Sequence, residues 1–129
     1  MTTATPSRTA DRLDLVLRVL LAVFFIAGSA LPKLLGEAYA VQIFDEIGAG
    51  DWFRYAIGIV ELAGGIGLLI PRLAGAAAAG LIGLMVGAAI TQVFVLDQPV
   101  FVITPIILGV LLAVVVRRHR ARIAELLRR

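Results

Sequence analysis

The residue with the clearest chemical potential is a single carboxylate inside an apolar run. Glu61 interrupts the stretch from Asp51 to Ile70 and lies ten residues after Asp51. In a helix, this spacing places the carboxylate ~15 Å below the membrane surface, close to the bilayer midplane. An acid at that depth costs ~2.5 kcal/mol or more unless it is neutralised or paired. We therefore expect Glu61 to bind a proton or to orient a ligand; a structural hydrogen bond between helices is the alternative.

Three further polar side chains are expected near Glu61. Lys33 lies at the outer end of the first apolar run, and Ser29 lies one helical turn before it on the same face. Gln92 lies in the outer third of the third apolar run, with alanines on its face, and is expected to point inward. The predicted ligand-binding residues are Lys33, Glu61, Gln92 and Ser29, in the outer half of a helix bundle. Direct contact between Lys33 and Glu61 stays open here, because the two differ in depth and because a lysine can also extend to the headgroups.

Composition restricts the metal and redox chemistry of the chain. The 129 residues contain no cysteine and one histidine, His119. Without thiolates there is no disulfide, iron–sulfur ligation or thiol relay, and one histidine in a basic tail does not supply a haem or metal site. We expect no metal and no covalently bound cofactor, so any electron chemistry would come from a bound quinone or from a partner. His119 is expected to be solvated, and Arg54 is expected to extend to the lipid headgroups.

The elements that position these residues are membrane spans. Apolar residues make up 60% of the chain and charged residues only 16%, whereas about a quarter of the residues of a soluble domain are charged. Four apolar runs are long enough to cross a bilayer as helices. We predict an all-α membrane protein, a four-transmembrane-helix bundle, with spans at about 13–35, 52–70, 73–96 and 99–116. The membrane domain, 13–116, would follow a flexible cytoplasmic segment, 1–12, and precede a basic cytoplasmic tail, 117–129.

A short helix on the membrane surface is predicted between the first two spans. Between Glu37 and Gly50, apolar residues recur at helical spacing while polar residues occupy the opposite face. Two glycines, Gly48 and Gly50, are suited to end it.

The distribution of basic residues predicts the orientation of the bundle. With four crossings, nearly all lysines and arginines fall on the side of the two termini, and only Lys33 and Arg54 fall on the other. Both termini are therefore expected in the cytoplasm, in a bacterial-type inner membrane. A cleaved signal peptide is the competing interpretation of the first run, but Arg18 within the run argues against it.

Small residues repeat along the third span. Gly75, Ala79, Gly83 and Gly87 follow one another every four residues, a spacing that brings them onto one helix face. Such ladders allow close backbone approach, so helix packing is the favoured interpretation. A ligand groove and a homodimer face are the alternatives.

Three motifs carry a resemblance to a known family. They are GSALPKLLG at 28–36, IGIVELAGGIGLLIP at 57–71 and LMVGAAIT at 84–91. Together they resemble the DoxX-like family of small four-span membrane proteins, from Leu15 to Val116. Members often carry a histidine directly after the threonine of the third motif. Here that position is Gln92, which cannot take up or release a proton.

The resemblance implies a four-helix membrane bundle more strongly than a reaction. Named members include a membrane subunit of a thiosulfate:quinone oxidoreductase and a membrane partner in an oxidative-stress complex. We therefore expect an accessory or ligand-binding subunit in the lipid bilayer that binds a lipid-soluble molecule such as a quinone, docks a redox protein partner and has no activity alone. No nucleic-acid partner is expected, and a homodimer stays open. The alternatives are a quinone-reducing subunit with Glu61 as proton carrier, a small proton-coupled transporter and a structural scaffold.

Overall fold

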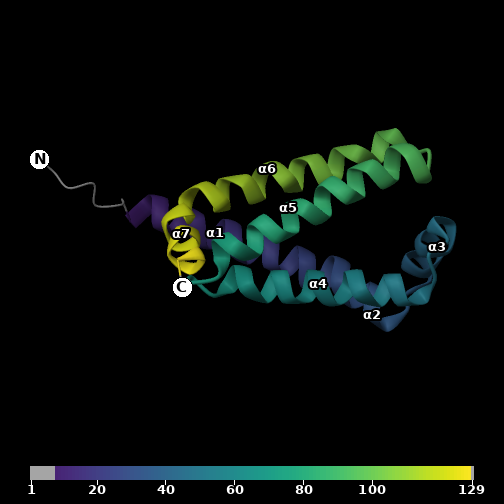
Figure 1. Cartoon of the computed structure of the whole chain (residues 1–129), viewed down its shortest axis with the longest axis horizontal. Helices are drawn as coiled ribbons and strands as arrows, with labels where there is room; N and C mark the ends of the chain where they lie inside the picture. The colour runs from purple at the N-terminus through teal and green to yellow at the C-terminus, as the bar shows by residue number, and fades with distance from the viewer. Residues whose placement is uncertain (1–7, 129) are drawn as a thin grey trace, which may run out of the picture.

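The chain forms an elongated bundle of helices, which a computed structural model describes for residues 8–128 (Figure 1). Four helical segments are long and apolar enough to cross a membrane: Arg8–Leu35, Asp51–Leu69, Ala74–Val95 and Val100–Arg118. The predicted all-α architecture with four membrane helices is therefore confirmed.

The first span is a continuous helix with a widened middle section. It consists of α1 (Arg8–Val23), the π-helix η1 (Phe24–Ala30) and α2 (Leu31–Leu35). Pro32 lacks an N–H group, and in a regular helix its ring would clash with the carbonyl four residues earlier. The wider π-helical turns before it absorb this mismatch, so the span continues through the proline. It ends at Gly36, which adopts the left-handed conformation with φ of 73°.

The start of this span corrects one prediction. Helix α1 begins at Arg8, so residues 8–12, which were predicted to be flexible, are helical. Residues 1–7 lie outside the described part of the chain.

The predicted short helix between the first two spans is α3 (Ala38–Ile47). The Glu37 carboxylate caps its start by accepting hydrogen bonds from the backbone N–H groups of Tyr39, at 2.9 Å, and Ala40, at 3.1 Å. Gly48 ends it with φ of 81°. Helix α3 buries Ala40 and Phe44 and lies at the end of the bundle farthest from the described termini (Figure 1).

The remaining spans follow with short connections. They are α4 (Asp51–Leu69), then α5 (Ala74–Ile90) continued by the π-helix η2 (Thr91–Val95), then the 3₁₀ turn η3 (Pro99–Val102) leading into α6 (Ile103–Arg118). A last helix, α7 (Arg120–Leu127), folds back against the start of α5. Gly75 permits this contact, because a Cβ atom there would lie 2.8 Å from Ile123 Cγ1 and 2.9 Å from His119 Cβ.

The four spans are arranged as two helix pairs. The first span packs on α4, and α5 packs on α6. The pairs meet in the half of the bundle nearer the described termini and diverge toward α3 (Figure 1). The core therefore lies in the half where they meet, and its largest fully buried side chains are Phe25, Leu68, Leu81, Leu112 and Val115.

Candidate ligand-binding site

One face of α4 carries the candidate site. Its buried residues Arg54, Gly58, Glu61, Gly65 and Leu68 recur at intervals of four and three, so they form a single stripe directed at the other helices. A Cβ atom at Gly58 would lie 2.9 Å from Leu34 Cδ2 and 3.2 Å from Lys33 Cβ. Glycine at this position therefore lets α2 approach α4 closely enough to bring Lys33 beside Glu61.

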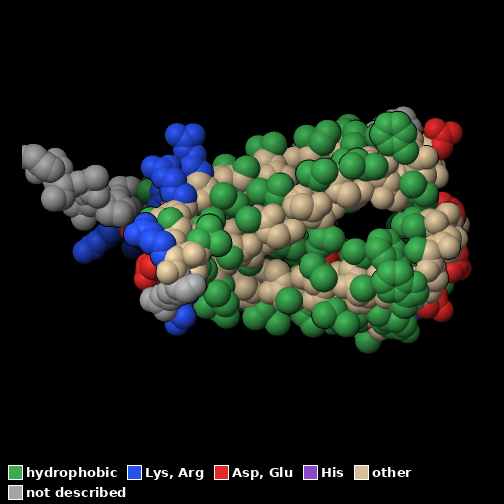
Figure 2. Space-filling view, in the orientation of Figure 1, with side chains coloured by type: hydrophobic (Ala, Val, Ile, Leu, Met, Phe, Trp, Pro, Cys, Tyr) green, Lys and Arg blue, Asp and Glu red, His purple; other side chains and the backbone are tan. Residues whose placement is uncertain are grey.

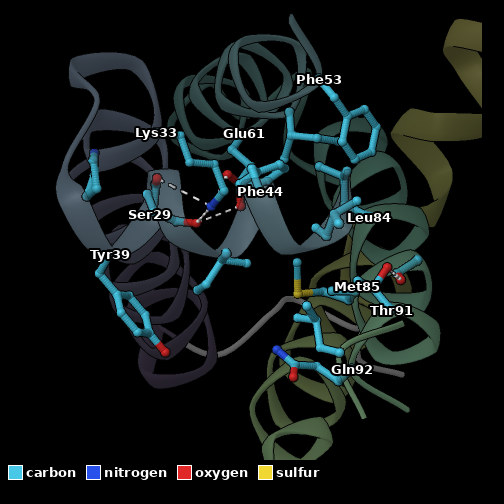
Figure 3. Close-up of a pocket in the computed structure, with 18 of the residues that line it drawn as sticks. Ser29, Lys33, Tyr39, Phe44, Phe53, Glu61, Leu84, Met85, Thr91 and Gln92 are labelled. Atoms are coloured by element: carbon cyan, nitrogen blue, oxygen red, sulfur yellow. Dashed lines mark hydrogen bonds and ion pairs between the residues drawn. The ribbon is translucent and has the colours of Figure 1, made fainter. Parts of the chain in front are cut away.

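Ser29, Lys33 and Glu61 form one hydrogen-bonded group, the Ser29–Lys33–Glu61 cluster (Figure 3). Lys33 Nζ lies 2.8 Å from Glu61 Oε1 and donates to Ser29 Oγ at 2.6 Å. Ser29 Oγ in turn donates to Glu61 Oε2 at 2.7 Å. Glu61 is only 3% exposed, so the carboxylate of this ion pair is held away from solvent. The contact between Lys33 and Glu61 is made because the first span continues through Pro32 and carries Lys33 on the same helix face as Ser29.

Arg54 is placed differently from the sequence-based expectation. It was predicted to extend to the headgroups, but it is 4% exposed and donates from Nη1 to the backbone carbonyl of Lys33. Its guanidinium carbon also lies 4.4 Å from the centre of the Tyr55 ring, a cation–π distance. The last turn of a helix leaves carbonyls without intrahelical partners, and α2 ends only two residues after Lys33. Arg54 satisfies one of these carbonyls and so fixes the end of α2 against α4.

A cavity of about 530 Å³ lies beside the cluster, between the diverging helix pairs. Its volume is in the range of small-molecule sites, which are mostly apolar with a few well-placed polar groups. Apolar side chains from three elements line much of it: Phe44 from α3, Phe53 and Ile57 from α4, and Leu84 and Met85 from α5 (Figure 3). The Ser29–Lys33–Glu61 cluster forms its main polar wall.

Gln92 lines the same cavity from η2, apart from the cluster (Figure 3). Its Oε1 atom is buried and has no hydrogen-bond partner among residues 8–128. The structure therefore brings three of the four predicted residues into contact and places the fourth on another wall of the cavity.

The small-residue ladder of α5 divides into two parts. Gly75 packs against α7, as helix packing predicts, but a Cβ atom at Gly83 or Gly87 would meet nothing within 4 Å. Both of these glycines line the cavity. The outer part of the ladder therefore borders a hollow instead of another helix.

A second polar group, which sequence reasoning did not identify, lies at the opposite end of the bundle. The Asp14 carboxylate contacts Arg18 Nε at 3.0 Å, His119 Nε2 at 2.9 Å and Arg118 Nε at 3.7 Å. Arg18 also donates to the Leu68 backbone carbonyl at 2.9 Å. We call Asp14, Arg18, Arg118 and His119 the Asp14 cluster.

The expectation that His119 is solvated is therefore wrong. The i,i+4 spacing of Asp14 and Arg18 could have indicated their pairing, whereas Asp14 and His119 are 105 positions apart. The Asp14 cluster ties the first span to the end of α4 and to the junction of α6 and α7. It is a structural connection rather than a pocket. Within residues 8–128, no group of three or more His, Cys, Asp or Glu side chains is arranged to hold a metal ion.

Comparison with known proteins identifies the family. The DoxX-like family matches residues 16–115, a range that contains the Ser29–Lys33–Glu61 cluster, Arg54 and Gln92. No match is found among curated proteins or among solved structures. The match covers most of the 129 residues, and the chain therefore belongs to the DoxX-like family.

Proposed function

We propose that this DoxX-like membrane protein is an accessory or ligand-binding subunit that holds the polar end of a lipid-soluble molecule, such as a quinone, in the cavity beside the Ser29–Lys33–Glu61 cluster. The observation that carries the proposal is a buried ion pair that borders a hollow. Burying two charges costs several kcal/mol of desolvation, which is repaid only when the remaining donors and acceptors are satisfied. An ion pair with a purely structural role would be expected inside packed side chains.

The polar groups of the cavity have different roles in the proposed binding: some contact the ligand and others position those that do. The Lys33 side chain is 17% exposed and that of Glu61 only 4%, so Lys33 is the member of the pair that a ligand reaches from the cavity. Of its three N–H donors, two are held by Glu61 and Ser29 Oγ, and the third makes only a long contact of 3.4 Å with the Ser29 backbone carbonyl, so this donor can turn to a carbonyl oxygen of the ligand. Gln92 lies on another wall, where its side-chain NH2 group can donate a second hydrogen bond to a carbonyl of the ligand; its unpaired Oε1 atom would accept one only from a ligand hydroxyl, such as that of a quinol.

A quinone-reducing subunit is the second candidate. Lys33 donates to Ser29 and Ser29 donates to Glu61, so Glu61 is the acceptor at the end of this chain and would have to take up a proton before passing one back along it to the cavity wall. Electrons would have to come from a protein partner, because the chain has no cysteine for a redox centre of its own. Docking of such a redox partner belongs to the same proposal.

The proposed location is a bacterial-type inner membrane with both termini in the cytoplasm. Lys33 and Arg54, the two basic residues predicted on the outer side, are mostly covered. The exposed charged residues at the α3 end are acidic, among them Glu37, Asp45, Glu46 and Asp51, whereas arginines gather at the other end (Figure 2). The arginines at the end of the described termini support the positive-inside orientation, because the rule depends on basic residues and acidic residues contribute little to it.

The test is a binding measurement on the purified protein with a decyl-substituted benzoquinone, together with mass spectrometry of the lipids and quinones that survive gentle purification. Lys33→Met and Glu61→Gln should each weaken binding about 10-fold or more, as expected when a hydrogen bond to a charged group is lost. Asp45→Asn is the matched control, because Asp45 is exposed on α3 and does not line the cavity. Unchanged binding in folded Lys33→Met and Glu61→Gln, with only ordinary phospholipid retained, would make the cluster a structural tie.

A further inference from the structure

We infer that the cavity opens sideways into the lipid bilayer, so that its ligand is a membrane amphiphile whose hydrocarbon chain passes between α5 and the helix pair formed by the first span and α4 into the surrounding lipid. This inference rests on the proposed function and specifies the class of molecule and its route.

Along the bundle axis, the inner end of the cavity is closed and its outer end is partly covered. Toward the described termini, the helix pairs meet and the core residues Phe25 and Leu81 are fully buried. Toward the outer end lies α3, whose buried Phe44 lines the cavity and packs on Phe53 with ring centres 5.7 Å apart. The core therefore closes the inner end, and α3 covers the part of the outer end that lies next to α2 and α4.

The side of the bundle is open between α5 and the pair formed by the first span and α4. In the described part of the chain, α3 packs mainly on α4 and touches the end of α2. Outside its own span, η1 packs mainly on α4. Neither covers the flank of α5. Figure 2 shows a hollow between α5 and the α3–α4 side, with hydrophobic side chains along its rim.

Exposed glycines lie at the rims of this opening. Gly28 on η1 and Gly83 and Gly87 on α5 are exposed and line the cavity. In contrast, a Cβ atom at Gly64 or Gly65 of α4 would lie 2.7 Å or less from a neighbouring side chain. The α4 glycines therefore serve helix packing, whereas the α5 glycines leave room beside bare backbone, where a hydrocarbon chain fits without displacing protein atoms.

The size and lining of the cavity identify the occupant. A volume of about 530 Å³ suits one end of a long amphiphile, and the rest of the molecule needs an apolar surrounding outside the protein. The polar end would lie at the Ser29–Lys33–Glu61 cluster and Gln92, and the chain would lie along Met85 and the α5 glycines.

Photolabelling tests this route directly. The protein is reconstituted in phosphatidylcholine–phosphatidylglycerol vesicles that contain phosphatidylcholine with a diazirine in one acyl chain, and labelled residues are mapped after illumination. Val86 is 55% exposed on the lipid side of α5 and gives the level of direct lipid contact, and Leu112, at 0% exposure, gives the background. Met85 lines the cavity and is 8% exposed. We expect Met85 labelling several-fold above that of Leu112; labelling of Met85 at the Leu112 level, with Val86 labelled, would overturn the inference.

Variants of α5 supply the matched control. The double variant Gly83→Leu with Gly87→Leu places side chains in the opening and should lower Met85 labelling several-fold. Gly80→Leu adds one leucine side chain to the same helix, where a Cβ atom also meets nothing within 4 Å, but Gly80 does not line the cavity. It should leave the labelling unchanged, and an equal loss in Gly80→Leu would contradict the inference.

The outcomes separate this inference from the proposed function. Quinone binding that depends on Lys33, without Met85 labelling, would reject the lateral route and keep the function. Met85 labelling that is blocked only by the Gly83 and Gly87 substitutions, with quinone binding indifferent to Lys33, would support the route and reject the function.

Discussion

At the scale of single residues, the buried carboxylates Glu61 and Asp14 are stabilised by ion pairs and hydrogen bonds with neighbouring side chains. Glu61 is held by Lys33 and Ser29, and Asp14 by Arg18, Arg118 and His119. Removing one member of a buried pair leaves the other charge unpaired, which costs more than the pair itself contributes. The two clusters should therefore respond to single and double substitutions in different ways from exposed ion pairs.

The Lys33–Glu61 pair should show strong coupling in a double-mutant cycle. Lys33→Met and Glu61→Gln should each lower the free energy of unfolding in detergent by about 2 kcal/mol, because each leaves a buried polar group without its partner. The combined variant should lose less than the sum of the two, with a coupling of about 1–3 kcal/mol. Additive losses would mean that the two charges do not depend on each other.

Asp14 should matter far more for stability than its neighbour Asp11. Asp14→Asn should lower the free energy of unfolding by about 2–4 kcal/mol, since the buried carboxylate has three cationic or histidine partners. Asp11 is the matched control, because its side chain is 61% exposed and also pairs with Arg118. Asp11→Asn should change the free energy of unfolding by less than about 1 kcal/mol. Thermal unfolding of both variants in the same detergent measures the difference; equal shifts would show that burial of Asp14 is not decisive.

At the scale of elements, two local features of the helices determine where the cavity lies: the π-helix η1 and the glycines of α4 and α5. The π-helix η1 lets the first span continue through Pro32, which carries Lys33 to Glu61. The glycines of α4 then bring the neighbouring helices close on one flank, while α5 keeps open glycines on the flank of the cavity. Lipid tails are as apolar as leucine, so moving an apolar side chain from lipid to a helix interface gains little free energy. Close backbone approach is therefore a main source of helix association in the membrane.

Glycines that look alike in the sequence should therefore differ in tolerance. A Cβ atom at Gly65 would lie 2.6 Å from Ile26 Cγ1 and 3.4 Å from the Ala22 carbonyl oxygen, so Gly65→Leu should destabilise the protein by about 2 kcal/mol or more through overpacking. Gly80→Leu, in open space on α5, should be nearly neutral or slightly stabilising, because glycine is a poor helix former. Thermal unfolding and size-exclusion profiles of the two variants provide the comparison; a neutral Gly65→Leu would contradict the packing role.

At the scale of the whole molecule, charge is separated along the bundle axis. Arginines gather at the end where α1 begins and α7 lies, and acidic side chains gather around α3 (Figures 1 and 2). Basic residues flanking membrane spans are retained in the cytoplasm, so this separation predicts the direction of insertion.

Cysteine labelling of intact cells tests the orientation. The chain has no cysteine, so a single introduced thiol reports one position without background. Glu46→Cys on α3 should react with a membrane-impermeant maleimide from outside, whereas Arg120→Cys on α7 should react only after the cells are permeabilised. The reverse pattern would place α3 in the cytoplasm.

The sequence was sufficient for the features that depend on local transfer free energy. Four apolar runs predicted four membrane helices, the helical spacing of apolar residues between 37 and 50 predicted α3, and the cost of a carboxylate in hydrocarbon singled out Glu61. Ser29, Lys33 and Gln92 were also identified, since few other polar residues lie in the outer halves of the spans.

Only the tertiary structure decided which of these residues meet. The rotation and divergence of the helices set the contact of Lys33 with Glu61, the burial of Arg54, the pairing of Asp14 with His119 and the hollow beside Gln92. The physical reason is that crossing a membrane depends on the apolar length of one segment, whereas a contact or a cavity depends on how separate segments pack. That packing is set by side-chain fit across distant parts of the chain, as at Gly58 and Gly65, and not by any single run of residues.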